Sequence, residues 1–173
     1  NGYGAKLTNI YSKKFVIETV DHSRGLKFVQ THKNNMSQKS VPKITPYKSK
    51  PYTKITFYPD LERFNLDCFT DDVMALFTKR VYDLAACTDS TVNIIYNNAK
   101  LAASSFQTYI DMYIGERSRA CEIVNEYWAI AASYNDKEMF EHVSFVNSIN
   151  TPRGGKHVDY VCKQITRAIT EKL

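Results

Sequence analysis

Asn1-Gly2-Tyr3-Gly4-Ala5-Lys6-Leu7 opens the chain, with two glycines around an aromatic residue, then a lysine, then helix-forming residues. Glycine has no Cβ, so its backbone can take a positive φ angle and approach a polyphosphate closely. The start of a helix adds free N–H groups and the positive end of the helix dipole. The stretch predicts a phosphate-binding loop that leads into a helix, with Lys6 as a positive charge. An ordinary turn before a helix is the alternative, and the motif alone does not decide between them.

The residues after this loop predict strands. A short helix is expected over residues 5–12, followed by a hairpin with strands at 15–20 and 26–32 and a turn at Ser23-Arg24-Gly25. Residues 34–51 read as a loop, because prolines interrupt them. Residues 52–58 alternate apolar and polar side chains, which predicts a third strand that ends at Pro59-Asp60.

The second half of the chain mixes helices and short strands. Helical periodicity predicts helices at 71–85, 105–114 and after the Gly154-Gly155 break. A strand is expected over 91–96 before a turn at Asn97-Asn98, and two more strands over 122–134 and 141–149 with a turn around 135–137. Helices mixed with hairpin-connected strands are typical of the α+β fold class.

Composition restricts the classes of function. With 173 residues, 43% of them apolar, the chain is long enough to bury a core. No apolar run reaches the length of a membrane span, so no membrane partner is expected. The four cysteines and four histidines lack the spacing of a zinc site or a disulfide framework, which leaves metal-only chemistry without support. Because the chain begins inside a motif and without an initiator Met, we expect it to be a piece of a longer polypeptide.

The net charge of +5 permits an anionic partner. The densest basic stretch is interleaved with Tyr47 and Tyr52 and comprises Lys33, Lys39, Lys43, Lys48, Lys50 and Lys54. It is interpreted either as a nucleic-acid patch or as a solvated basic loop held extended by prolines, and the second interpretation is favoured. The same two interpretations apply to Lys156, Lys163, Arg167 and Lys172, which lie among the apolar positions of the last helix.

Three separated strings together resemble a known family. The first is residues 1–7 with Asn9-Ile10-Tyr11-Ser12, and the second is Tyr52-Thr53-Lys54-Ile55-Thr56-Phe57 with Pro59-Asp60-Leu61. The third is Ser144-Phe145-Val146-Asn147-Ser148-Ile149 with Gly154-Gly155-Lys156-His157. In this order and spacing they are similar to the N-terminal ATPase region of eukaryotic-type type IIA DNA topoisomerases, within the GHKL superfamily of ATPases.

The resemblance implies a fold and a domain division. Residues 1–103 would be the C-terminal part of a GHKL-type α/β sandwich that binds ATP, and residues 104–173 the start of the transducer domain. The parent protein would be an enzyme that uses ATP and homodimerises through its ATPase region to pass one DNA duplex through a transient break in another. It would act in the nucleus, or at a viral replication site or in the virion if virus-encoded.

The resemblance also implies site residues. Asn1, Gly2, Tyr3, Gly4, Ala5 and Lys6 would contact the ATP phosphates, with Mg²⁺ bridging them. No residue of this chain is assigned as the catalytic general base, because the family's glutamate would precede Asn1. Another GHKL ATPase, or a binding module that retains the fold without hydrolysis, stays an alternative. Asn150 stands where the eukaryotic-type pattern has Ala, which is a departure from the family.

Overall fold

The structure is a computed structural model that describes residues 2–89, 91–101 and 105–173. It consists of two compact units, Asn1–Thr70 and Asp71–Leu173. The predicted domain boundary at Ala103 lies outside the described residues and stays a prediction.

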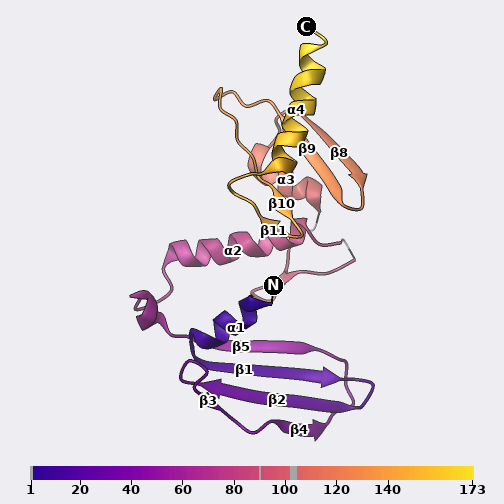
Figure 1. Cartoon of the computed structure of the whole chain (residues 1–173). Helices are drawn as coiled ribbons and strands as arrows, with labels where there is room; N and C mark the ends of the chain where they lie inside the picture. The colour runs from indigo at the N-terminus through magenta and orange to yellow at the C-terminus, as the bar shows by residue number, and fades with distance from the viewer. Residues whose placement is uncertain (1, 90, 102–104) are drawn as a thin grey trace. The chain divides into compact units, whose positions relative to one another are not determined.

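Unit 1 is a helix followed by an antiparallel sheet (Figure 1). The helix α1 (Tyr3–Ile10) leads into β1 (Ser12–Asp21), β2 (Leu26–Lys33), β3 (Gln38–Lys39), β4 (Lys43–Pro46) and β5 (Thr53–Pro59), and a 3₁₀ turn follows at Leu61–Phe64. The strand order is β3-β2-β1-β5, and β4 also pairs with β2. The long strands β1 and β2 therefore form the centre of the sheet.

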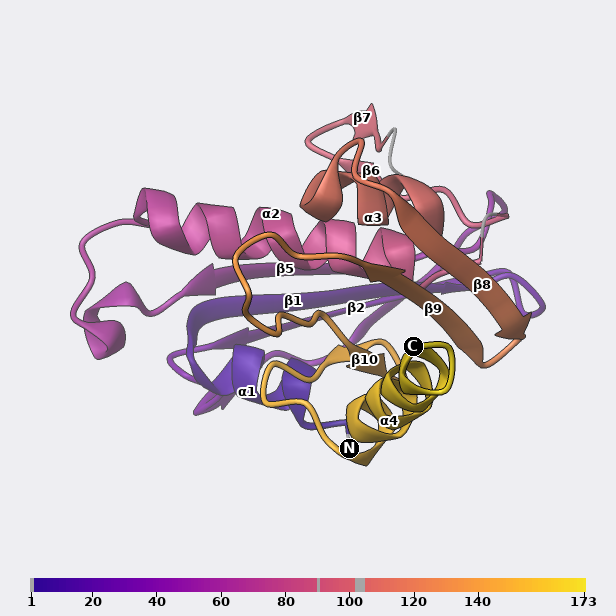
Figure 2. The ribbon, with the colours of Figure 1, turned by 90° about the horizontal axis from the view of Figure 1, so that it is seen from above.

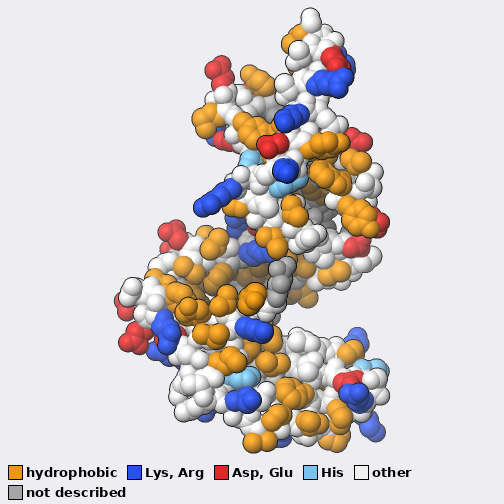
Figure 3. All heavy atoms as spheres, viewed as in Figure 1, with side chains coloured by type: hydrophobic (Ala, Val, Ile, Leu, Met, Phe, Trp, Pro, Cys, Tyr) orange, Lys and Arg blue, Asp and Glu red, His pale blue; other side chains and the backbone are white. Residues whose placement is uncertain are grey.

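The register gives the sheet two different faces. Residues that pair across strands share a face, and neighbours along a strand point to opposite faces. Phe15 pairs with both His32 and Phe57, so all three side chains lie on one face. Phe15 is 1% exposed and His32 is buried, whereas Phe57 stays 44% exposed. Hydrophobic side chains gather over the strands of this unit in Figure 3.

The β1–β2 hairpin matches the sequence prediction, but the connection after it does not. Asp21 Oδ1 accepts hydrogen bonds from the backbone N–H groups of Ser23 and Arg24, and Gly25 takes a φ angle of 63°. The expectation of a plain loop over 34–51 was wrong, because β3 and β4 lie within it. Prolines are tolerated at the ends of an edge strand, where no ladder hydrogen bond is lost, and Pro46 ends β4.

Unit 2 contains three helices and three short hairpins. Its helices are α2 (Asp71–Ala86), α3 (Phe106–Ile114) and α4 (Lys156–Thr170). Its strands pair as β6 (Ile95–Tyr96) with β7 (Ala99–Lys100), β8 (Arg119–Asn125) with β9 (Trp128–Ser133), and β10 (Phe145–Val146) with β11 (Ile149–Asn150). Seen from above, the β8–β9 hairpin lies between α3 and α4 (Figure 2). The three predicted helices are confirmed.

Two strand predictions in unit 2 were wrong. Residues 122–134 are not one strand but fall within the β8–β9 hairpin, which begins at Arg119, and residues 141–149 contribute only the short strand β10 and the first residue of β11. The missed turn lies at Asn125, whose Oδ1 accepts hydrogen bonds from the N–H groups of Tyr127 and Trp128 at 2.8 and 3.0 Å. Asparagine is itself a turn-forming residue, and its side chain closes this turn without the glycine or proline that would mark the turn more clearly in the sequence.

The β6–β7 turn was predicted correctly, although its strand is shorter than expected. Asn97 and Asn98 take φ angles of 50° and 64°, the left-handed conformation that a two-residue hairpin turn requires. The strand covers only Ile95–Tyr96 rather than 91–96. Among the described residues, none of the helices has the length and apolar character needed to cross a membrane.

A buried polar cluster fixes α2 against α3. The Tyr109 hydroxyl donates a hydrogen bond of 2.6 Å to Asp83 Oδ1, and Lys79 Nζ contacts both carboxylate oxygens at 2.9 and 3.0 Å. Asp83 is 3% exposed and Tyr109 is 6% exposed. Burial, followed by the bond to Asp83, raises the pKa of Tyr109 well above its ordinary value, so its hydroxyl stays protonated and donates.

Replacement of Tyr109 by Phe tests this cluster. Tyr109→Phe removes a donor from a buried carboxylate, and we expect the free energy of unfolding to fall by about 1–3 kcal/mol in urea titrations. Tyr113→Phe is the matched control. The Tyr113 hydroxyl lies 3.0 Å from the Tyr109 hydroxyl, but Tyr113 is 43% exposed, so water can take the place of the hydroxyl that this variant removes. A loss of equal size in both variants would show that the Asp83 contact is not the important one.

Candidate functional site

The predicted phosphate-binding residues lie at the start of α1. Gly2 precedes the helix with a φ angle of 83°, which favours glycine, and no side chain caps the helix. Tyr3, Gly4, Ala5 and Lys6 form the exposed first turn, and Tyr3 is 68% exposed. Asn1 lies outside the described residues. Among the described residues, no side chain accepts from the first-turn N–H groups, and no acidic residue lies in that turn.

Both glycines leave open space beside the backbone. A Cβ built at Gly2 or Gly4 would meet no atom within 4 Å. The conformation of Gly2 requires glycine, whereas Gly4 has an ordinary helical conformation that alanine would adopt more readily. Internal packing therefore gives no reason for glycine at position 4. Close approach of a ligand to the backbone would be such a reason.

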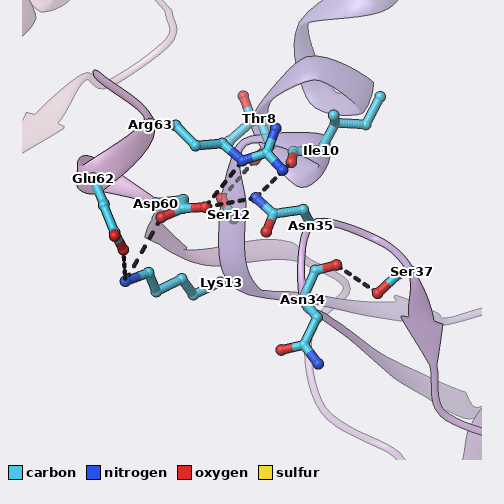
Figure 4. A network of polar contacts seen from close by, with 10 residues as sticks. All are labelled: Thr8, Ile10, Ser12, Lys13, Asn34, Asn35, Ser37, Asp60, Glu62 and Arg63. Atoms are coloured by element: carbon cyan, nitrogen blue, oxygen red, sulfur yellow. Dashed lines mark hydrogen bonds and ion pairs between the residues drawn. The ribbon is translucent and has the colours of Figure 1, made fainter. Parts of the chain in front are cut away.

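A buried network fixes the other end of α1 (Figure 4). Asp60, which follows β5, is 6% exposed, and its N–H donates to the carbonyl of Tyr11 at 2.8 Å. Its Oδ2 accepts hydrogen bonds from Asn35 Nδ2 at 3.0 Å and Arg63 Nε at 3.2 Å. Within the described ranges Oδ1 makes no hydrogen bond, and it faces Lys13 Nζ at 3.6 Å. The carboxylate thus collects donors from three separate segments.

Asn35 carries this network into the helix. Its Nδ2 also donates to the carbonyl of Ile10, the last residue of α1, at 2.9 Å. Asn34, Asn35 and Met36 all have positive φ angles, and this tight turn points the Asn35 amide at the helix end. A helix C-terminus leaves backbone carbonyls without partners inside the helix. Asn35 and Asp60 supply those partners, so the position of α1 depends on the sheet.

Hydroxyl groups continue the connection along α1. Ser12 Oγ donates to the carbonyl of Thr8 at 2.5 Å, and Thr8 Oγ1 donates to the carbonyl of Gly4 at 2.9 Å. Ser12 is 1% exposed, so its position is set by its surroundings. Asn9, also buried, has an Oδ1 without a hydrogen-bond partner among the described residues. The sequence does not mark Asp60 or Asn35 for this role, because the partners that define it lie 25 residues apart along the chain.

A second set of contacts explains the third string of the sequence. Ser144 Oγ lies 2.6 Å from Thr151 Oγ1, which lies 3.1 Å from His157 Nε2. These contacts join the β10–β11 hairpin to the first turn of α4. Gly154 and Gly155 take φ angles of 70° and 144° there, and a Cβ on either would press against a histidine ring at 3.1–3.3 Å. The string therefore encodes a compact connection into α4.

The comparisons with known proteins agree with this geometry. Residues 90–173 match the family model described as DNA gyrase B. The chain is 46% identical to DNA topoisomerase 2 of Arabidopsis thaliana over 98% of its own length and 45% identical to that of Acanthamoeba polyphaga mimivirus over 98%. It superposes with a TM-score of 0.92, at 41% identity and over 99% of its length, on the ATPase region of Saccharomyces cerevisiae topoisomerase II.

The chain belongs to the type II DNA topoisomerase family. The ATPase and transducer domains of topoisomerase II from Balamuthia mandrillaris match it as well, at a TM-score of 0.92 and 44% identity over 99% of the chain. The predicted α+β fold of the family's ATPase and transducer regions is confirmed. The chain spans 12% and 14% of the two curated topoisomerases and 46% and 44% of the two solved regions.

The Asp60 network gives a testable effect on α1. Asp60→Ala leaves Asn35, Arg63 and Lys13 without their shared acceptor, so we expect the free energy of unfolding to fall by about 2 kcal/mol. Hydrogen exchange of the α1 amides should accelerate in the same variant. Glu62→Ala is the control, because the Glu62 side chain is 87% exposed and, among the described residues, forms an ion pair with Lys13 alone; its effect should stay under about 0.5 kcal/mol. Unchanged exchange in Asp60→Ala would contradict the role of Asp60.

Proposed function

We propose that the protein carrying this chain is an ATP-dependent type II DNA topoisomerase. In this proposal, ATP binding closes a homodimer through the ATPase region, and the closure drives passage of one DNA duplex through a transient double-strand break in another. The observation that supports it most is the likeness along 98–99% of the chain to type II topoisomerases and their ATPase regions. The uncapped glycine turn of α1 supplies a matching chemical feature.

In this proposal the start of α1 binds the ATP phosphates. The backbone N–H groups after Gly2 would donate to phosphate oxygens, and the positive end of the helix dipole would favour their charge. Lys6 would neutralise part of that charge. Gly4 would let the phosphates approach the backbone, since a Cβ there would occupy the open space beside it. Asn1, Tyr3 and Ala5 complete the proposed contact set.

Mg²⁺ is proposed only as a companion of the triphosphate. Within the described ranges, no group of three or more His, Cys, Asp and Glu side chains could hold a metal ion. The residues present therefore do not form a metal site of their own, and we derive no step through the ion. Duplex DNA and a second copy of the protein are the proposed partners, and the nucleus is the proposed location, or a viral replication site or the virion if a virus encodes the protein.

A strand-passage assay tests the whole proposal. The full-length protein that carries this chain should separate interlocked DNA circles in the presence of ATP, and should not do so without ATP. Separation of interlocked duplexes requires passage of one through the other, which simpler ATPases do not perform. Hydrolysis of ATP without separation would favour another GHKL ATPase. The absence of hydrolysis in an intact protein would favour a binding module that retains the fold.

Gly4→Ala tests the phosphate contacts. Alanine is more favourable than glycine inside a helix by about 1 kcal/mol, and a Cβ at position 4 meets no atom within 4 Å. The helix α1 should therefore be at least as stable in this variant as in the wild type. The methyl group would hold the phosphates away, and we expect the KM for ATP to rise by about tenfold or more, which corresponds to a loss of at least about 1.4 kcal/mol of binding.

Gly25→Ala is the control for this variant. Gly25 has a φ angle of 63°, so alanine strains the β1–β2 turn and lowers stability. It lies outside the proposed contact set, so the KM for ATP should not change. An unchanged KM in Gly4→Ala would remove α1 from the proposed binding site.

A further inference from the structure

One face of the unit 1 sheet gathers lysines from four strands. Side chains that pair across strands share a face, so the register places these groups together. Lys14 of β1 is opposite Lys33 of β2, and Lys54 of β5 is opposite Glu18 of β1. Glu18 is in turn opposite Val29, which is opposite Lys43 of β4. This face, called the basic face below, carries Lys14, Lys27, Lys33, Lys43 and Lys54 with a single acidic residue, Glu18.

Most of this positive charge is not neutralised by ion pairs among the described residues. Lys27 Nζ forms an ion pair with Glu18 Oε1 at 3.0 Å. None of the other four lysines of the basic face forms an ion pair with an acidic side chain in the part of the chain that the structure describes, and all four are exposed. The pKa of Glu18 is lowered, first by its hydrogen bonds from Tyr52 and Lys27. Glu18 therefore stays ionised and is already paired.

The spacing of the four lysines without ion pairs suits a rod-shaped, negatively charged partner. Lys14 and Lys33 lie side by side at one end of the face, and Lys54 and Lys43 lie four residues further along the strands. Four residues of an antiparallel strand span about 13–14 Å. Small uncharged side chains, including Val16, occupy the row between the two ends. A sheet face with ammonium groups at both ends can contact phosphates on both sides of a DNA groove.

The aromatic residues of this face favour contact with the DNA backbone rather than with bases. Lys14 Nζ lies over the Tyr58 ring at 5.3 Å. Lys27 Nζ lies 5.5 Å from the Tyr47 ring centre and 5.8 Å from that of Tyr52. Base stacking needs a free ring face. Each of these three rings has an ammonium group over one of its faces, so the tyrosines hold Lys14 and Lys27 in place.

We propose that the basic face is a docking surface for the phosphate backbone of duplex DNA. The proposal rests on the proposed function, which brings a duplex to this protein. It assigns to the sheet a binding role separate from the nucleotide contacts of α1. It also revises the interpretation of the basic stretch as a solvated loop, because Lys33, Lys43 and Lys54 lie in strands whereas Lys48 and Lys50 do not. Lys39, opposite His32, lies on the other face.

Two charge-matched variants of the full-length protein test the proposal. The face variant is Lys33→Gln, Lys43→Gln, Lys54→Gln, and the control variant is Lys39→Gln, Lys48→Gln, Lys50→Gln. Affinity for a fluorescent duplex is measured by anisotropy at several salt concentrations. Each lost phosphate contact reduces the slope of log K against log salt by about 0.9. We expect the face variant to lower the slope by about 2 to 3, and the control by less than about 1. Equal slopes in the two variants would overturn the proposal.

A crosslinking experiment keeps the proposal testable if the face variant fails to fold. Lys54→p-benzoylphenylalanine places a photoreactive group on the basic face, and Lys39→p-benzoylphenylalanine places it on the opposite face. Irradiation with a duplex should link DNA to position 54 and not to position 39. Crosslinks from position 54 only to protein would indicate an acidic protein partner and overturn the proposal, as would no crosslink at all.

The outcomes also separate this proposal from the proposed function. If the wild-type protein separates interlocked circles but the two lysine variants have equal slopes, the docking surface is wrong and the topoisomerase function stands. The opposite result is also possible: the wild-type protein fails to separate interlocked circles, the salt slope falls only in the face variant, and DNA crosslinks only to position 54. In that case the docking surface stands and the proposed function is wrong.

Discussion

The buried carboxylate of Asp60 is the constraint on which unit 1 depends. A carboxylate removed from water must be satisfied by hydrogen bonds and positive charges, or its burial is costly. Asn35, Arg63 and Lys13 provide these partners, and they come from the turn after β2, the 3₁₀ turn and the start of β1. The same residues therefore hold β1, β2 and β5 in register and fix the end of α1. The proposed phosphate contacts lie at the opposite end of the same helix.

Local chemistry made much of the fold predictable from sequence. The β1–β2 hairpin has alternating side chains and a glycine turn, and α4 has apolar residues at helical spacing after two glycines. Asn97-Asn98 carries the turn residues that a two-residue hairpin requires. In these segments the period of the side chains and the turn chemistry agree, so one interpretation is favoured over the others.

The wrong predictions occur where tertiary contacts decide. β4 forms because it pairs with the edge of β2. The residues of β4 stand next to prolines and do not by themselves predict a strand. The turn at Asn125 depends on a side-chain acceptor rather than on glycine, so two strands were read as one. At the candidate site, the motif predicts a phosphate-binding role for the glycines and Lys6, and that role stays a prediction. The roles of Asp60 and Asn35 could not be predicted, because their partners are distant in sequence and their burial follows from the assembled sheet.

The three left-handed residues at 34–36 have a consequence for the order of folding. Asparagine and methionine do not hold this conformation strongly by themselves, so the turn gains its stability from the contacts that Asn35 makes. Those partners, Ile10 and Asp60, are each 25 residues away along the chain, in opposite directions. Closing two such intervals costs chain entropy before any bond is gained. The helix that precedes the sheet therefore becomes fixed late, after the hairpin and the last strand have met, and an emerging polypeptide would complete this corner only once all three segments are available.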